Sequence, residues 1–145
     1  MGDRGILQGN DFAERLFVWV VSLFSFAVLS QIFLAGYAAL LAPQAWDEHV
    51  AWVHIFQWLS VVLPVTGYFS DRRIWLVLLN CIPMSIIGLQ YMLIHMAIRR
   101  GEPALVDLHA VGGVLLFGVL VYSLQEWRYR LRSQKSLKPE ADLTK

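Results

Sequence analysis

Two copies of a short pattern, Pro-x-x-x-Asp-x-His, hold the residues of this chain that are most able to do chemistry. The first copy ends at His49 and the second at His109. Each copy opens a long apolar run, and proline and aspartate both favour the first turn of a helix. The repeat indicates a duplicated two-helix unit in which the two imidazoles are structural equivalents. Imidazole is a common ligand of haem iron and of other metals.

Four long apolar segments must position these histidines. Hydrophobic residues make up 57% of the 145 residues, and the mean hydropathy is +0.53, far above a soluble globular composition. The apolar runs predict helices over about 15–42, 43–69, 72–98 and 103–127, each long enough to cross a hydrocarbon core of about 30 Å. We therefore expect an all-α membrane protein, an up-and-down four-helix transmembrane bundle, with a duplicated helix pair as the origin of the repeat.

The charges along the chain indicate its orientation. Residues 1–14 form a polar head and residues 128–145 a basic tail, and four spans place both on one side of the membrane. Of the 12 Lys and Arg residues, only Arg99 and Arg100 fall on the other side. This positive-inside bias predicts that both termini are cytoplasmic. The net charge of +1 gives no reason to expect nucleic acid as a partner, so the expected partners are the lipid bilayer and other membrane subunits or further copies of the chain.

All four histidines are expected at the non-cytoplasmic end, where a pair on the second and fourth helices could hold haem b. These helices face each other across a diagonal of about 13 Å when neighbouring axes are 8–10 Å apart, which suits two imidazoles and a metal centre. His109 is the fourth-helix candidate. On the second helix, His49 matches it in the repeat, whereas His54 lies deeper, so His49 is preferred and His54 is the alternative ligand.

Further polar and small residues extend the candidate site. Gln31, Gln57 and Gln90 each lie well inside an apolar span, where an amide needs partners on neighbouring helices. Gly112 and Gly113 follow His109 on one stripe and leave room for a planar ring, although small residues also serve simply to let membrane helices approach. We take the three glutamines and two glycines as the candidate lining of a haem site.

Several short motifs carry a resemblance to known proteins. They are Gln31-Ile-Phe-Leu-Ala-Gly36, Trp46-Asp-Glu-His49 followed by His54, Gln90, and Leu108-His109. With these motifs the chain resembles an uncharacterised family of small bacterial four-span membrane proteins. That resemblance implies a multi-pass protein of the bacterial inner (cytoplasmic) membrane.

More distantly, the first-span motif followed by a histidine that opens the next helix resembles one half of the haem A synthases. This similarity implies a duplicated helix pair with haem ligated by histidines of the second and fourth helices, here His49 and His109. It does not carry over their catalysis, because this chain is half their length. An electron-transfer or accessory role is therefore expected rather than an enzymatic one.

Other classes of function compete with a membrane haem protein. A cofactor-free structural or accessory subunit would use the same histidines and glutamines to bridge helices, and a quinone- or pigment-binding subunit would use one histidine. Transport is disfavoured, because no polar residue at depth on the cytoplasmic side stands out. Cys81 has no partner for a disulfide, and neither a Ser-His-Asp nor an HExxH spacing is present to suggest hydrolysis.

Overall fold

The chain folds into four long helical spans. Its structure, a computed structural model, describes residues 4–70 and 74–137. The elements are α1 (Arg4–Leu40), the short 3-10 helix η1 (Pro43–Ala45), α2 (Trp46–Phe56), α3 (Leu59–Ser70), α4 (Ile74–Arg100) and α5 (Pro103–Leu137). Four stretches are long and apolar enough to cross a membrane, namely Phe12–Leu40, Pro43–Ser70, Ile74–Arg100 and Pro103–Arg130. The predicted all-α four-helix membrane bundle is thus confirmed.

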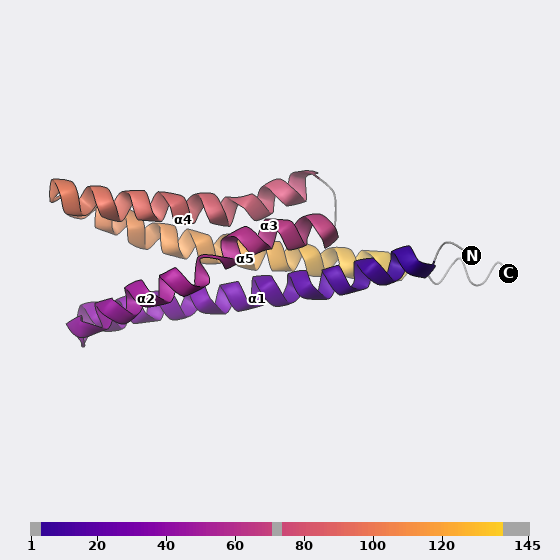
Figure 1. Cartoon of the computed structure of the whole chain (residues 1–145), viewed down its shortest axis with the longest axis horizontal. Helices are drawn as coiled ribbons and strands as arrows, with labels where there is room; N and C mark the ends of the chain where they lie inside the picture. The colour runs from indigo at the N-terminus through magenta and orange to yellow at the C-terminus, as the bar shows by residue number, and fades with distance from the viewer. Residues whose placement is uncertain (1–3, 71–73, 138–145) are drawn as a thin grey trace.

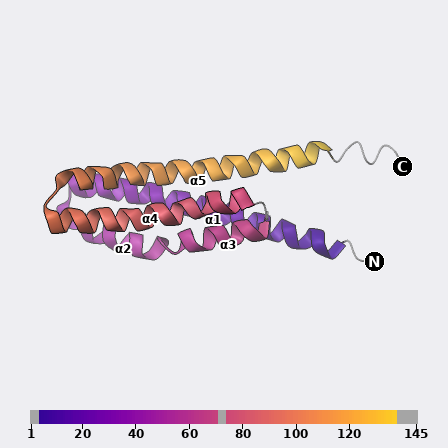
Figure 2. The same cartoon turned by 90° about the horizontal axis from the view of Figure 1, so that it is seen from above.

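The spans run up and down with neighbours in sequence packed side by side. Helix α1 packs against η1, α2, α3 and α5, and α4 packs against α3 and α5. The second span, made of η1, α2 and α3, therefore lies diagonally across the bundle from α5. The η1 turn and the α4–α5 turn share one end, which we call the histidine end (Figure 1). The start of α1 and the end of α5 project at the opposite, termini end (Figure 2).

Local chemistry explains both turns at the histidine end. Pro43 cannot donate a backbone hydrogen bond, and it occupies the first position of η1, where that bond is not needed. Gly101 ends α4 with a positive φ of 66°, and its amide bonds back to the carbonyl of Ala97 at 2.8 Å. Glycine tolerates this left-handed conformation without steric cost.

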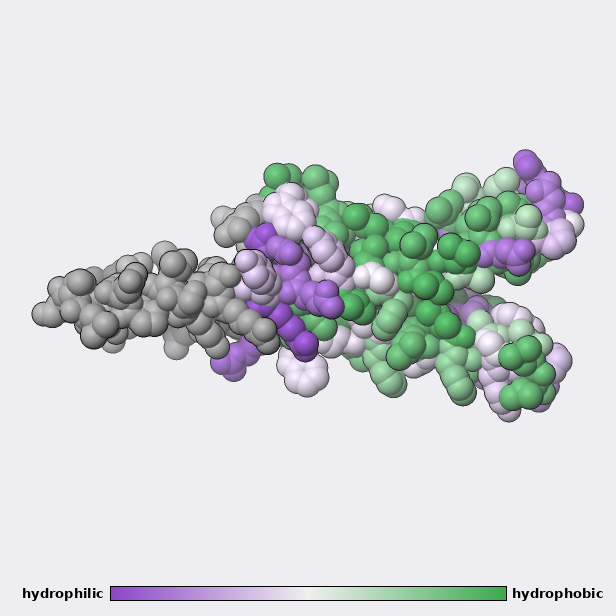
Figure 3. Space-filling model, turned by 180° about the vertical axis from the view of Figure 1, so that it is seen from behind, coloured by the Kyte–Doolittle hydropathy of each residue, from purple (hydrophilic) through white to green (hydrophobic). Residues whose placement is uncertain are grey.

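Helix α1 supplies half of the residues in the bundle core. Its inward stripe repeats every three or four residues, as a helix packed on one face requires. The core cluster consists of Phe17, Val20, Val21, Phe24, Ala27, Val28, Phe56, Leu63, Ile87, Leu116, Leu120 and Trp127. Many large apolar side chains are nevertheless exposed, and they form an apolar band across the middle of the molecule (Figure 3). Such a band faces lipid in a membrane protein.

The second span is interrupted in mid-course. Helix α2 ends at Phe56 and α3 begins at Leu59, so the break falls at Gln57 and Trp58. The sequence predicts a bend at Pro64, but this proline lies inside α3, beyond the break. Ser60 caps the interruption, because its amide and its hydroxyl both donate to the carbonyl of Gln57, at 3.0 and 2.6 Å. Side-chain bonds of this kind allow a membrane helix to break.

Candidate functional site

Two glutamine–histidine contacts join neighbouring helices near the histidine end. In the first half of the chain, Nε2 of Gln31 on α1 donates to the carbonyl oxygen of His49 on α2 at 2.9 Å. In the second half, Nδ1 of His109 on α5 lies 3.2 Å from the carbonyl oxygen of Gln90 on α4. The same pair of residue types therefore links the two spans of each half, although the atoms that meet are different.

The contact of His109 with Gln90 determines which nitrogen of its ring carries the proton. A carbonyl oxygen only accepts hydrogen bonds, so Nδ1 of His109 must carry the proton that is donated to Gln90. In the neutral imidazole, Nε2 then keeps its lone pair. Histidines that bind metals are commonly oriented in this way, with one nitrogen donating to a carbonyl and the other free to ligate.

His49 lies on the span diagonally opposite that of His109. Both side chains are half-buried. The ring of Trp46 meets the His49 ring edge-on, with centroids 5.3 Å apart and planes at 78°. The two histidines of the repeat thus lie on diagonally opposite spans near the same end of the bundle.

Three buried polar atoms around this pair have no hydrogen-bond partner among the described residues. They are Oε1 of Gln31, Nδ1 of His49 and Oε1 of Gln90. A buried polar group without a partner costs about 1–3 kcal/mol. These three atoms make the region one where a further polar or metal-bearing group would be stabilised.

The predicted glycine pair lies against Gln90. A Cβ added at Gly112 would stand 3.1 Å from the carboxamide carbon of Gln90, and one added at Gly113 would stand 3.7 Å from its Nε2. The missing side chains therefore accommodate the Gln90 amide, which occupies part of the space that the sequence assigns to a flat ring.

A cleft separates the helices that carry these residues. At the histidine end, α1 and α2 diverge from α4 and α5 (Figure 1), and the space-filling view shows this end divided into two lobes (Figure 3). Gln31 and His49 belong to α1 and α2, and Gln90 and His109 belong to α4 and α5.

His54 and Gln57 belong to a different cluster. The hydroxyl of Tyr91 on α4 donates to Oε1 of Gln57 at 2.9 Å and lies 3.3 Å from Nδ1 of His54. His54 is exposed, unlike the half-buried His49. His95 is also exposed, and its Nδ1 contacts the carbonyl of Tyr91 within α4. The geometry thus favours His49 over His54 as the partner of His109.

The sequence analysis missed three polar residues buried toward the termini end. Asn80 and Ser123 are each 3% exposed and Trp127 is 6% exposed. Within the described part of the chain, Oδ1 of Asn80, Oγ of Ser123 and Nε1 of Trp127 have no hydrogen-bond partner. The premise that no polar residue lies at depth on this side is therefore wrong. Asn80 could have been found from its spacing to the buried Leu76, Pro83 and Ile87, which lie on the same helix face.

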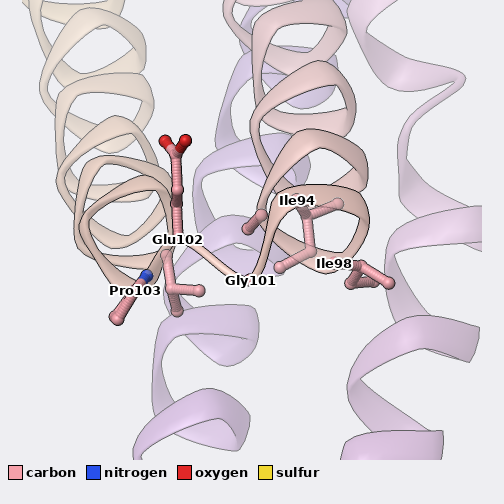
Figure 4. Close-up of a pocket in the computed structure, with 7 residues that line it drawn as sticks. Ile94, Ile98, Gly101, Glu102 and Pro103 are labelled. Carbon is pink, nitrogen blue, oxygen red and sulfur yellow. The ribbon is translucent and has the colours of Figure 1, made fainter.

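Other sites for a metal or ligand are sparse. Among residues 4–70 and 74–137, no group of three or more His, Cys, Asp or Glu side chains is placed to hold a metal ion. A shallow hollow at the α4–α5 turn is lined by Ile94, Ile98, Pro103 and neighbouring residues, with the Glu102 carboxylate pointing away from the isoleucines (Figure 4). No histidine lines it, so the pair at His49 and His109 remains the stronger candidate.

Comparison with known proteins yields one family. Residues 31–98 match DUF6220, a family of unknown function. The match begins at Gln31 and includes His49 and Gln90, but it stops before His109. The chain matches no curated protein and no solved structure.

Proposed function

We propose that this protein is an integral membrane b-type haem protein, or the haem-bearing subunit of a larger membrane redox complex, with His49 and His109 as the iron ligands. The observation that supports the proposal is a pair of half-buried imidazoles on diagonally opposite spans, near one end of the bundle. Haem held by two histidines supplies one-electron transfer.

The donor set fits this group. His109 is held with its Nε2 lone pair available, because its Nδ1 proton is engaged by the Gln90 carbonyl. His49 has a buried Nδ1 without a partner among the described atoms, and its backbone carbonyl is engaged by Gln31. One ring is therefore oriented by the protein, and the other is free to turn toward a ligand.

The space beside Gly112 fits a haem ring once the Gln90 amide has moved aside. This amide is the group in closest contact with Gly112, so it is the side chain that a flat ring would displace. Its Oε1 has no hydrogen bond to lose among the described residues. Rotation of Gln90 therefore opens the glycine surface without breaking a bond of that oxygen.

The charge distribution supports a position of the proposed site near the non-cytoplasmic face. Ten of the 12 Lys and Arg residues belong to the side with both termini, which the positive-inside rule makes cytoplasmic. By its resemblance to small bacterial four-span proteins, the chain resides in the bacterial inner membrane. Its partners are the lipid bilayer and redox subunits or further copies of itself.

A cofactor-free accessory subunit is the second candidate. The observation that favours it is the Gln90 amide seated on Gly112, which already fills part of the space between the helices. In that case the glutamines and histidines serve to hold the two lobes of the histidine end in place.

Absorption spectroscopy separates the two candidates. The protein is expressed with a haem precursor, purified in mild detergent, and measured in the oxidised and the dithionite-reduced state, with haem quantified against protein. We expect about one haem per chain. His95→Ala is the matched control, because His95 is exposed and its ring contacts only the Tyr91 carbonyl of its own helix among the hydrogen bonds of the described residues. Protein without a Soret band under these conditions would leave the accessory role as the better account.

The two ligands should respond differently to removal. His109→Ala removes the ring that is anchored to Gln90, so we expect loss of the Soret band. His49→Ala removes the ring without a side-chain anchor, so we expect reduced occupancy and a five-coordinate haem that binds carbon monoxide, visible as a difference spectrum. Equal retention of pigment in both variants would contradict the assignment.

A further inference from the structure

A second polar cluster lies apart from the histidine pair, where α2 meets α4. Gln57 directs its Nε2 to the carbonyl of His54 at 3.3 Å and its Oε1 to the hydroxyl of Tyr91 at 2.9 Å. These two contacts fix the orientation of the Gln57 amide. The His54 carbonyl can only accept, so it faces the amide nitrogen, and the Tyr91 hydroxyl then donates its proton to the amide oxygen. The Tyr91 hydroxyl has a single proton, and the bond to Gln57 uses it.

This arrangement determines which nitrogen of His54 carries its proton. Nδ1 of His54 lies 3.3 Å from the Tyr91 oxygen. Since Tyr91 donates to Gln57, the oxygen can only accept from His54, so Nδ1 is protonated. In the neutral ring Nε2 is then a bare acceptor, and no described residue donates to it. The ring is exposed at the surface of the bundle.

The depth of His54 makes this acceptor unusual. His54 is eleven residues beyond Pro43, which is about 16 Å along a helix at 1.5 Å per residue. His54 is also close to the midpoint of the Pro43–Ser70 stretch, which is long enough to cross a hydrocarbon core of about 30 Å, so we infer that the ring lies deep in that core. Phospholipid head groups stay at the membrane boundary and do not reach a side chain at this depth. Ionisable side chains inside a membrane span are costly, and they commonly mark functional sites.

The break in the second span adds polar backbone beside the ring. The backbone hydrogen bonds across the break come from the amides of Gln57, Ser60, Val61 and Val62. Within the described ranges, the amides of Trp58 and Leu59 are not among these donors. Irregular backbone at membrane depth is tolerated where it is covered by protein or lines a cavity. The side chains of Ile55 and Trp58 nearby are each 66% exposed, which offers an apolar surface.

We propose that His54, Tyr91 and Gln57 form a binding site for a lipid-soluble phenol or hydroquinone, whose hydroxyl donates to Nε2 of His54. The ligand must bring a hydrogen-bond donor on an otherwise apolar body, because only such a molecule reaches the middle of the bilayer. Tyr91 and Gln57 are positioning residues that hold the histidine in its acceptor form. The site does not depend on haem at His49 and His109, so the two proposals fail or succeed separately.

The test uses the full chain in lipid nanodiscs with two matched probes. Decylhydroquinone carries the donor, and its dimethyl ether keeps the ring and the tail but has no O–H. Binding is followed by quenching of tryptophan fluorescence. We expect the hydroquinone to bind roughly fivefold more tightly, the effect of one net hydrogen bond of about 1 kcal/mol. Equal affinities, or no binding of either probe, would overturn the proposal.

Variants locate the site. His54→Phe should abolish the preference for the hydroquinone, whereas His95→Phe, one turn beyond Tyr91 and exposed, should leave it unchanged. Tyr91→Phe removes the oxygen that accepts the Nδ1 proton of His54. The His54 ring can then present either nitrogen to the ligand, so the difference in affinity between the hydroquinone and its dimethyl ether should become smaller. Far-UV circular dichroism confirms folding of each variant. A preference that survives His54→Phe would refute the assignment.

The tautomer can be observed directly. Nitrogen-15 spectra of histidine-labelled protein should show a protonated Nδ1 and an unprotonated Nε2 for His54, and Tyr91→Phe should shift the balance. A protonated Nε2 in the unsubstituted protein would contradict the inference. If native mass spectrometry showed a dimer that His54→Phe dissociates, with no hydroquinone bound, the acceptor would belong to an interface between copies and the ligand proposal would be wrong.

Discussion

Replacing Gly67 by alanine should weaken the bundle through one defined contact. A Cβ at this position would stand 2.5 Å from Nδ2 of Asn80 and 3.4 Å from the ring of Phe17. The first distance is far inside van der Waals contact, and Asn80 is only 3% exposed, so its amide has little room to retreat. Overpacking of this kind costs about 1–3 kcal/mol.

Helix propensity opposes this loss and must be separated from it. Exchanging glycine for alanine inside a helix gains up to about 1 kcal/mol. Gly88→Ala is the matched control, because Gly88 is also helical and a Cβ there meets nothing within 4 Å. The difference between the two variants therefore isolates the contact with Asn80, and we expect Gly67→Ala to be the less stable by about 1–3 kcal/mol.

The assay is unfolding by sodium dodecyl sulfate in mixed micelles, followed by far-UV circular dichroism. A double-mutant cycle with Asn80→Ala removes the obstructing amide, so Gly67→Ala should cost less in that background, with a coupling of about 0.5–3 kcal/mol. Equal stability of Gly67→Ala and Gly88→Ala, or strict additivity with Asn80→Ala, would refute the packing that we infer.

Three further substitutions test the fold with the same assay. Gly101→Ala should cost about 1 kcal/mol, because the residue that ends α4 has a φ of 66°; unchanged stability would contradict that turn. Trp52→Phe should cost about 0.5–1.5 kcal/mol, because Nε1 of Trp52 donates to the carbonyl of Ala27 at 3.1 Å; a neutral result would show that the bond is dispensable. Gln31→Leu should stay within about 1 kcal/mol of the unsubstituted protein, since the lost bond to the His49 carbonyl is offset by removal of an unpartnered buried oxygen; a larger loss would indicate that Oε1 has a partner.

The spans could be predicted from sequence because hydropathy and turn chemistry act locally. Pro43 and Gly101 mark the two turns of the histidine end by their own backbone preferences. The start of α1 and the end of α5, at the termini end, were harder to predict. Helix α1 starts at Arg4 and α5 continues to Leu137, beyond the apolar stretches, because no proline stops either helix there.

The break in the second span could not be predicted from local pattern, because neither proline nor glycine stands at Gln57 or Trp58. Pro64 removes one backbone donor, yet it is accommodated inside α3. The helix instead opens at Gln57, where the hydroxyl of Ser60 and the amide of Gln57 itself offer replacement bonds and Tyr91 on another helix completes the cluster. That contact with Tyr91 depends on tertiary structure, which a local pattern does not contain.

The candidate site was partly predictable for a similar reason. Spacing and topology placed the histidines at one end, and the repeat matched His49 with His109 rather than His54. The partners of each ring follow from side-chain directions that spacing does not specify. The Gln90 amide lies on Gly112, in space that the sequence alone suggests is empty. Asn80 was overlooked because a single asparagine in an apolar run barely changes its hydropathy.

Gln90 lies at one level of the bundle and Asn80 and Ser123 at another, with large apolar side chains between the two levels. Gln90 contacts Gly112, so Asn80, ten residues back on α4, and Ser123, eleven residues on along α5, both lie about 15 Å nearer the termini end. Between the levels, Phe24, Leu63 and Leu120 are fully buried. These side chains separate the histidine level from the termini end in this conformation.

This layer limits how the proposed site can exchange electrons or ligands. A polar solute from the termini end would have to displace Phe24, Leu63 and Leu120, each of which loses about 1.5–3 kcal/mol of apolar burial when exposed to water. The cleft, in contrast, opens at the histidine end, and the His54 cluster opens toward lipid. A redox partner of the proposed haem site would therefore reach it from the histidine end or through the bilayer, and the hydroquinone proposed at His54 would use the second route.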